Sequence, residues 1–455
     1  MEQIESLPSI TPRHFTPNKP FDFSKEAQYD GRLLHHADIP PPRALSRGKV
    51  EVRARKARDR AQRMLGFFDN EVLEFQSPHA FSYFAARRLE YLGARNSRSY
   101  PDFIAGIKAQ RMKRFSNSSP NPFSIRIFTD DNQKILSAFQ YRAPDDMIRS
   151  NRLLVAEGRR PDVLEQPGRS APRRKGQHHL IPENLRLQYL HAVQGLLSVL
   201  PPEKVESSRR HGAVDGSYQT SHYFTHRGWD GKQDLTPERK GTLHIVPCWT
   251  QQGRPLHTMT PSAAFTANGC ATAALENFYS QGVELHIWLD AIMEHEFPTQ
   301  YPAFKKAHEA GRWYESDPGP HLGRVIVWKL GSEDHLDHAD AIPTVVYTLS
   351  GNYVGGFMDL LDIGTRLEYG PGALIAGFFG HLWHVVTPHE DRLCNPDPRY
   401  LELGLTPGRV SVVNYFPTDA FHQLHDKSGG WGRRTLYGRL EDPEEVDRGW
   451  VSKRT

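Results

Sequence analysis

Apolar positions recur at helical spacing through the first half of the chain. Residues 45–74 carry one narrow apolar stripe among many arginines, which predicts a helix with a single buried edge. The stripe consists of Val50, Ala54, Ala57, Ala61 and Met64. Further helices are predicted over residues 78–93, 101–115, 184–200, 262–281 and 285–295. Residues 1–43 have no sustained period and predict an extended arm.

The faces of three of these helices can also be predicted. The apolar face of the helix at 78–93 comprises Phe81, Phe84, Ala85 and Leu89. The exposed side of the helix at 101–115 comprises Lys108, Arg111, Lys113 and Arg114. The pattern at 184–200 predicts an amphipathic helix. Residues 116–182 predict a loop-rich connector with one strand at 123–128.

The second half changes to short apolar runs separated by Gly and Pro turns. One strand is predicted at 242–249, and from residue 321 onward strands are predicted at 325–330, 344–349, 357–361, 374–379, 382–386 and 410–416. Short strands with regular turn punctuation are typical of an antiparallel sandwich or jelly roll. The predicted fold class is therefore α+β, with a double-stranded β-helix (jelly-roll) core, supporting helices and a helical, basic N-terminal half.

Charge and cysteine content restrict the functional classes. Residues 1–210 contain 36 Lys and Arg against 23 Asp and Glu, whereas the remainder is acidic. This asymmetry fits either a polyanion-binding surface or an ordinary solvated face. The arginine-rich run at 50–64 resembles a nuclear-localisation patch. Three scattered cysteines exclude a disulfide framework and fit a reducing, intracellular compartment, and no apolar run is long enough for a membrane helix.

A His-x-Asp pair in the second half suggests a metal site. The chain contains four such pairs, and His335/Asp337 is distinguished by the β-branched strand, the Gly355-Gly356 turn and the strand-borne histidine that follow it. Residues i and i+2 share one face of a strand, so His335 and Asp337 can bind one ion. His384 is the preferred third ligand and His381 the competing one. Two imidazoles and a carboxylate form a facial triad that leaves three positions on Fe(II).

The open positions fit 2-oxoglutarate and dioxygen. The keto-acid end of 2-oxoglutarate would take two of them, and its distal carboxylate needs a charge partner, for which a bidentate arginine is best suited. Arg409 opens the strand at 410–416, and Ser411 follows on the same face. Arg392 and Arg399 are the alternatives, and Arg409 could also be an ordinary surface arginine.

These residues resemble the TET/JBP family of Fe(II)/2-oxoglutarate nucleobase dioxygenases, in its fungal-type branch. Residues 321–420 contain the family's motifs in the family's order. These are His335-Leu-Asp337 with Thr344-Val-Val-Tyr-Thr-Leu349, then His384-Val-Val-Thr-Pro388, and finally Arg409-Val-Ser-Val-Val-Asn-Tyr415. The resemblance implies that His335, Asp337 and His384 bind iron and that Arg409 and Ser411 bind 2-oxoglutarate. It also implies that Tyr415 stacks on an extruded base.

Asp340 lies where the family's animal members place an asparagine on the cytosine edge. A carboxylate there can accept a hydrogen bond from N4 of cytosine or N6 of adenine, although Asp340 could instead cap the turn before Pro343. The chain departs from the family in carrying Pro417 in place of a histidine near the base, and in lacking the cysteine-rich zinc module.

We therefore expect a dioxygenase that oxidises a methyl group of 5-methylcytosine or N6-methyladenine in DNA. The same chemistry on a small molecule or protein, and a metal-binding jelly roll without activity, are the competing hypotheses. The predicted organisation is an arm at 1–43, a basic helical region at 44–210, the dioxygenase domain at 211–440 and a tail at 441–455. A nuclear monomer is expected.

Overall fold

The computed structural model describes residues 47–95, 97–140, 179–202, 241–250, 259–267, 269–391 and 408–438. Within these ranges no helix combines the length and the apolar character needed to cross a bilayer. The predicted arm at 1–43, the tail at 441–455 and the boundary between residues 210 and 211 lie outside the described residues. The predicted division into domains therefore stays a prediction.

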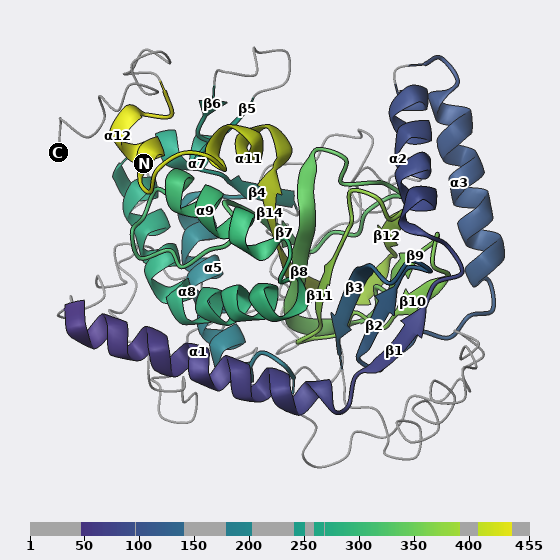
Figure 1. Cartoon of the computed structure of the whole chain (residues 1–455), viewed down its shortest axis with the longest axis horizontal. Helices are drawn as coiled ribbons and strands as arrows, with labels where there is room; N and C mark the ends of the chain where they lie inside the picture. Colours follow the sequence, from purple (N-terminus) through teal and green to yellow (C-terminus); the bar gives the residue numbers. More distant parts are fainter. Residues whose placement is uncertain are drawn as a thin grey trace, which may run out of the picture.

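Helices and strands are interspersed up to Gly311, and strands predominate from Gly323 to Pro417 (Figure 1). The helices are α1 (Arg47–Asp69), α2 (Phe81–Arg95), α3 (Tyr100–Phe115), α5 (Glu183–Val199), α7 (Ala263–Thr266), α8 (Gly269–Glu296), α9 (Tyr301–Gly311), α11 (Thr418–Leu424) and α12 (Trp431–Thr435). The strands are β1 (Leu73–Gln76), β2 (Ile125–Phe128), β3 (Lys134–Phe139), β4 (Gly241–Ile245), β5 (Trp249–Thr250), β6 (Met259–Thr260), β7 (Gly323–Trp328), β8 (Asp340–Gly355), β9 (Met358–Leu360), β10 (Thr365–Leu367), β11 (Leu374–Gly377), β12 (His384–Val386), β13 (His389–Asp391) and β14 (Gly408–Pro417).

A nine-stranded sheet forms the centre of the molecule. Its strands follow the order β1-β2-β3-β11-β8-β14-β7-β4, with β13 paired to β8. Neighbouring strands run antiparallel except for β1 and β2, which are parallel. A second sheet has the order β10-β9-β12, and β5 pairs with β6 in a short ribbon. The predicted combination of helices with a largely antiparallel sheet is confirmed.

The large sheet is buried on both faces. On β7, Arg324 lies against the helices, where its guanidinium carbon is 4.6 Å from the ring centroid of Tyr279 on α8. Val325 and Val327, the alternate residues, line a cavity on the opposite face. Because side chains alternate across a strand, one face is covered by helices and the other borders the cavity. This double burial explains why the predicted strands are continuously apolar.

Two helices were predicted, over residues 262–281 and 285–295. The structure instead has the short helix α7 followed by one long helix, α8. α8 continues through Gly282, which lies between the two predicted ranges. A Cβ atom at Gly282 would come within 2.6 Å of Cε2 of Tyr189. The glycine is therefore required because α5 packs closely on α8 there, and it does not end the helix.

The prediction that α5 is amphipathic is wrong. The helix lies among other elements, and its buried side chains include Arg186, Gln188 and Gln194 as well as its leucines. Its polar residues therefore do not mark a solvent face. Nη1 of Arg186, for example, donates to the backbone carbonyl of Leu349 at 3.2 Å.

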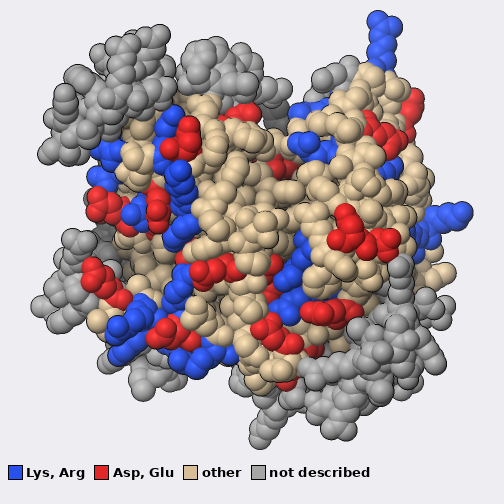
Figure 2. Space-filling model, in the orientation of Figure 1, with Lys and Arg blue, Asp and Glu red and all other residues tan. Residues whose placement is uncertain are grey.

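The helix predicted at 45–74 is confirmed as α1, but it ends at Asp69, and the last two predicted positions belong to β1. Many of its charged side chains form ion pairs within the protein. Ala57 and Ala61 are buried, as the stripe predicted. Arg58 pairs with Asp290 and Glu294 of α8, and Arg60 pairs with Glu284. Basic and acidic side chains lie close together on the face shown in Figure 2. The basic composition of this region is therefore not in itself a free cationic surface.

Two predicted helix faces are also corrected. Leu89, placed on the apolar face of α2, is 66% exposed. Arg111, placed on the exposed side of α3, forms ion pairs with Asp334 and Asp359. Helical periodicity identifies which residues share a face, but not which charged residues face a buried partner.

A buried carboxylate, Glu296, joins the end of α8 to the edge of the large sheet. Oε1 of Glu296 lies 2.6 Å from Nη2 of Arg126, and Oε2 lies 2.9 Å from Nζ of Lys134. Ser137 donates a further hydrogen bond at 2.6 Å. Burial alone would raise the pKa of Glu296, but the hydrogen bond and charge of Arg126 outweigh it and lower the pKa to about 2. The ionised form is therefore the one that stabilises the fold.

Replacing Glu296 by alanine is expected to lower the free energy of unfolding by about 3–5 kcal/mol, because Arg126 loses its buried partner. Since the folded-state pKa is depressed, this contribution is present above the ordinary value of 4.5 and is lost as the pH falls towards 2. Urea denaturation at several pH values measures both effects. Glu74→Ala is the matched control, because Glu74 faces the same arginine at 3.6 Å but is 55% exposed. Equal losses in both variants would contradict the assignment.

Candidate functional site

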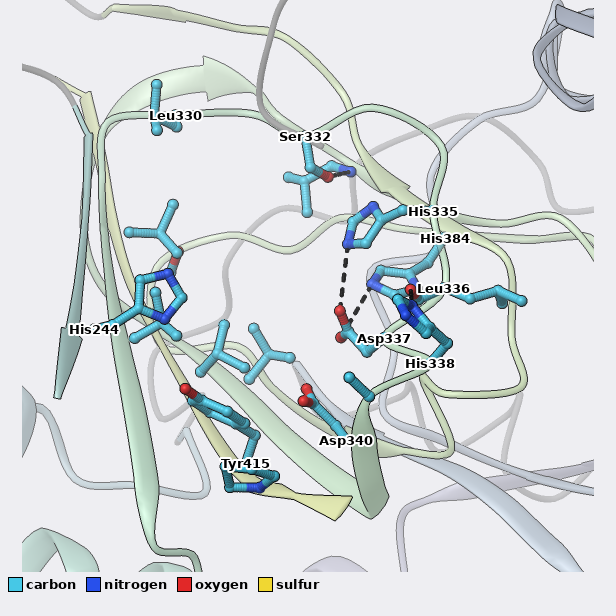
Figure 3. Close-up of a pocket in the computed structure, with 18 of the residues that line it drawn as sticks. His244, Leu330, Ser332, His335, Leu336, Asp337, His338, Asp340, His384 and Tyr415 are labelled. Atoms are coloured by element: carbon cyan, nitrogen blue, oxygen red, sulfur yellow. Dashed lines mark hydrogen bonds and ion pairs between the residues drawn. The ribbon is translucent and has the colours of Figure 1, made fainter. Parts of the chain in front are cut away.

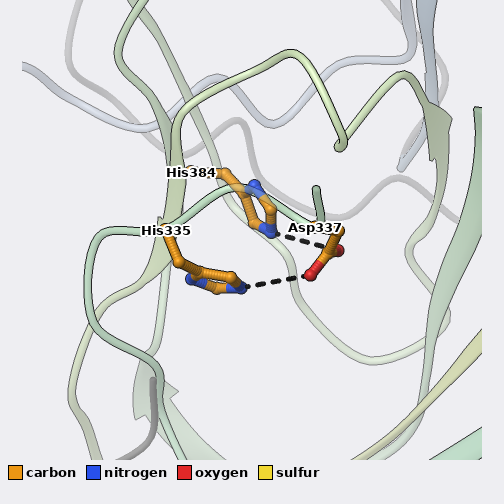
Figure 4. A group of neighbouring side chains, drawn as sticks. All are labelled: His335, Asp337 and His384. Atoms are coloured by element: carbon orange, nitrogen blue, oxygen red, sulfur yellow. Dashed lines mark ion pairs between the residues drawn. The ribbon is translucent and has the colours of Figure 1, made fainter. Parts of the chain in front are cut away.

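His335, Asp337 and His384 come together although they lie on different segments. His384 begins β12, and His335 forms an isolated antiparallel bridge with it. The bridge is made by two backbone hydrogen bonds, of 3.0 Å and 3.1 Å. Asp337 follows in irregular chain, so the expectation that His335 and Asp337 share one regular strand is wrong. Their side chains nevertheless converge (Figure 4).

The spacing of the three side chains suits a metal ion. Nε2 of His335 lies 3.6 Å from Oδ1 of Asp337, and Nε2 of His384 lies 3.6 Å from Oδ2. These distances are longer than hydrogen bonds, and one ligand atom from each residue lies within 4.8 Å of the others. The side chains are only 6–11% exposed. Two imidazoles and a carboxylate so arranged can occupy one face of a coordination shell.

Each imidazole is oriented by a backbone carbonyl. Nδ1 of His335 lies 2.6 Å from the carbonyl oxygen of Glu333, and Nδ1 of His384 lies 2.9 Å from that of Leu382. A carbonyl only accepts, so each Nδ1 carries the proton and each Nε2 has a lone pair directed towards Asp337. This is the tautomer and orientation that a metal ligand requires.

His381, the competing ligand, lies elsewhere. Its ring packs against Phe81, with the centroids 5.2 Å apart. Burial, and secondarily the charge of Arg88, lower its pKa to about 4. Among the described residues, the metal-like cluster contains His384 and not His381.

One cavity of about 420 Å³ is lined by all seven predicted site residues. They are His335, Asp337, Asp340, His384, Arg409, Ser411 and Tyr415. Figure 3 shows His335, Asp337 and His384 grouped on one side, with Asp340 and Tyr415 near one another and His244 across the cavity. The volume lies in the range of small-molecule sites. The cavity lies between residues of the large sheet and residues of β9 and β12.

Arg409 is a buried cation in the wall of this cavity, only 1% exposed. Its Nη1 donates to the carbonyl of Gly356 at 3.1 Å, and its Nη2 donates to that of Leu330. The rings of Tyr353 and Tyr369 lie 5.9 Å and 5.3 Å from its guanidinium carbon. Gly356 is required there, because its φ is +72° and a Cβ would come within 2.9 Å of Nη1. Burial raises the pKa of Tyr369 despite the neighbouring cation, so the phenol stays neutral.

The guanidinium of Arg409 lacks an anionic partner among the described residues. Its contacts are neutral carbonyls and aromatic rings, and its buried Nε has no hydrogen-bond acceptor. Burying a cation without an anion is costly. An anionic ligand in the cavity would supply the missing charge, so the donor set favours a carboxylate or a phosphate there.

The remaining predicted residues lie on strands of the large sheet. Ser411 is two residues after Arg409 on β14, and Tyr415 lies farther along the same strand. Tyr415 packs on Gly323, where a Cβ would come within 2.7 Å of its ring. Asp340 opens β8 and lines the cavity. The alternatives Arg392 and Arg399 lie outside the described residues.

Sequence reasoning missed several residues of the cavity wall. His244 and Trp249 come from β4 and β5, with their ring centroids 5.7 Å apart, and Tyr91 and Arg95 come from α2. His244 lies in a predicted strand, so a histidine among apolar residues was the available signal. Nothing local indicated that α2 reaches the cavity, because that contact is made across more than 200 residues of chain.

Comparison with known proteins leaves the family open. No family model matches the chain, and no curated protein matches it. Among solved structures, NgTET1 in complex with 5mC DNA is 8% identical with a TM-score of 0.38, covering 73% of this chain and 96% of that one. OsALKBH1 is 13% identical with a TM-score of 0.21, covering 29% of this chain and 63% of that one. At these identities and TM-scores, neither similarity assigns the chain to a family.

Proposed function

We propose that the chain is an Fe(II)- and 2-oxoglutarate-dependent dioxygenase that oxidises a methyl group on a DNA base. The observation that carries the proposal is that one cavity is lined by a largely buried cluster of two histidines and one carboxylate and by a buried guanidinium that lacks a described counter-ion. A metal cluster alone would fit many proteins. The added cation suits a cosubstrate that is both a metal chelator and a dianion.

Each residue has a defined task in this proposal. Iron, bound by His335, Asp337 and His384, would supply the activation of dioxygen that is coupled to conversion of 2-oxoglutarate to succinate and carbon dioxide. Asp337 offsets part of the metal charge, and the two imidazoles bind through Nε2. Arg409 pairs with the distal carboxylate of 2-oxoglutarate, and the hydroxyl of Ser411 donates a hydrogen bond to it. One oxygen atom enters succinate and the other becomes the hydroxyl group on the substrate methyl.

The substrate end of the cavity fits a nucleobase. Asp340 can accept a hydrogen bond from an exocyclic amine, which both 5-methylcytosine and N6-methyladenine carry. Tyr415 offers an aromatic face for a base extruded from a duplex. We accordingly propose a TET/JBP-like enzyme with a jelly-roll core, acting on DNA as a nuclear monomer.

Turnover of methylated oligonucleotides tests the proposal. The full-length chain is incubated with Fe(II), 2-oxoglutarate and DNA containing either methylated base, and mass spectrometry measures succinate and oxidised bases. One succinate is expected for each oxidation step on the bases, above the succinate formed without DNA. His335→Ala is expected to abolish both products, whereas His381→Ala, a nearby histidine outside the cluster, retains them. Equal product from wild type and His335→Ala would contradict the proposal.

Replacing Asp340 by asparagine is expected to change the preference between the two bases by at least about tenfold. A hydrogen bond to a charged group contributes about 1.5–3 kcal/mol, and the carboxamide both donates and accepts. Competition between 5-methylcytosine and N6-methyladenine oligonucleotides in one reaction measures the ratio. Succinate formed without DNA reports whether the metal centre is intact, and Asp426→Asn, at an exposed position, is the control. An unchanged ratio would assign Asp340 to the turn before Pro343.

A further inference from the structure

We propose that the helical hairpin formed by α2 and α3 positions the metal ligands, and that Arg111 is its principal positioning residue. The inference rests on the proposed function, because it takes His335, Asp337 and His384 as metal ligands. In Figure 1 the two helices stand together beside β9, β10 and β12. Their sequence suggested a basic surface, but their inward side contacts the segments that carry the ligands.

The hairpin packs against apolar residues that alternate with the metal ligands along the chain. Leu336 lies between His335 and Asp337, and Trp383 precedes His384; both apolar side chains are at most 1% exposed. They belong to an apolar cluster that packs around the ligand segments and reaches the cavity wall through Tyr91, Tyr100 and Leu336. The cluster contains Tyr91, Ile107, Leu336, Leu361 and Trp383, with Leu92, Tyr100, Phe103 and Ile104 packed against it.

Arg111 connects α3 to the segment that carries His335 and to β9, the strand paired with β12. Its Nε lies 2.8 Å from Oδ1 of Asp334, the residue before His335. Its Nη1 lies 3.4 Å from Oδ2 of Asp359 on β9. Asp359 is paired in register with Val385, the residue after His384. One guanidinium therefore links the segment of His335 to the strand that is hydrogen-bonded to the segment of His384.

The Arg111 contact is reinforced from both sides. Asp359 is fully buried and is also bound by Arg366, with contacts of 2.6 Å and 2.8 Å. On α2, Arg88 donates to the backbone carbonyl of His338 at 2.9 Å. Arg87 lies 3.4 Å from Asp362, whose other carboxylate oxygen accepts from the backbone NH of Trp383 at 2.9 Å. Arginines of both helices thus bind the chain next to the ligands.

Support from the hairpin matters because the segment of His335 and Asp337 is held by isolated backbone hydrogen bonds to residues such as Val386 and Phe379, and not by a regular ladder. His335 is joined to β12 by a single bridge, and Asp337 lies in irregular chain. Metal sites require ligand positions accurate to about 0.5 Å. The hairpin supplies the rigid support that a regular strand would otherwise provide.

Co(II) binding to the full-length chain tests the inference without requiring turnover. Arg111→Gln is expected to weaken Co(II) affinity by about 10- to 100-fold, the range typical for groups that orient metal ligands, and to change the ligand-field absorption spectrum. Arg111→Lys, which keeps the charge, is expected to recover part of the affinity. Arg98→Gln makes the same type of change at an exposed position and is expected to bind like wild type.

The outcomes separate the inference from the proposed function. Circular dichroism of the metal-free variants establishes that they are folded, and if Arg111→Gln does not fold, Arg111→Lys is used in its place. Wild-type affinity and an unchanged spectrum in the folded Arg111 variant would overturn the positioning role. Absence of Co(II) binding by wild type, or equal binding by wild type and Asp337→Ala, would instead overturn the metal centre itself.

Discussion

Replacing Asp337 by alanine is expected to lower Fe(II)-dependent succinate formation by more than about a hundredfold. Changes in groups that merely orient a ligand typically cost 10- to 100-fold in metal affinity, and this change removes a ligand itself. Asp337 is the single carboxylate in the His335–His384 cluster within the described chain. Its loss leaves two neutral imidazoles, which cannot offset the charge of a divalent ion in a site that is about one-tenth exposed.

Two measurements establish the cause of this loss. Equilibrium dialysis with Co(II) separates failure to bind metal from failure to turn over, and thermal unfolding of the metal-free protein shows whether the fold is intact. Asp426→Ala is the matched control, because this carboxylate is 58% exposed and its partner is the adjacent Lys427. Retention of metal and activity in Asp337→Ala would refute the proposed ligand set.

Replacing Arg409 by methionine is expected to raise the KM for 2-oxoglutarate by about 10- to 150-fold. A hydrogen bond to a charged group contributes about 1.5–3 kcal/mol, and the buried site excludes the water that would otherwise replace it. The fold is expected to tolerate the change, because methionine has a similar length and the substitution removes a buried cation that has no anionic partner among the described residues. Steady-state kinetics with varied 2-oxoglutarate and urea denaturation measure the two effects.

Metal binding by the Arg409 variants distinguishes a loss of 2-oxoglutarate binding from a loss of the metal site. Co(II) binding to Arg409→Met is expected to match wild type, because the guanidinium contacts Gly356 and Leu330 and none of the three metal ligands. Arg409→Lys keeps the positive charge without the bidentate geometry and is expected to fall between wild type and methionine. A large loss of stability with an unchanged KM would make Arg409 a structural residue.

Much of the secondary structure could be predicted from local sequence pattern, in the segments where the apolar residues follow a single period. The stripe of α1 with Ala57 and Ala61, the extent of α3 and the apolar strands of the second half followed from side-chain spacing alone. β1, β3, β6, β10 and β13 were not predicted, because short strands within loop-rich sequence have too few residues to establish a period. The two helices predicted at 262–281 and 285–295 are one helix, because Gly282 admits the ring of Tyr189 and does not interrupt α8.

The sequence by itself determined which histidines, carboxylates and arginine lie in or next to predicted strands, in an order that suggests metal and anion binding. Only the tertiary structure decided which of these side chains meet and which are buried. It brought His335, Asp337 and His384 within coordination distance, and left Arg409 buried with neutral partners among the described residues. It also turned Arg111 inward, away from solvent. Burial and charge pairing depend on contacts between residues far apart in the chain, which local spacing does not specify.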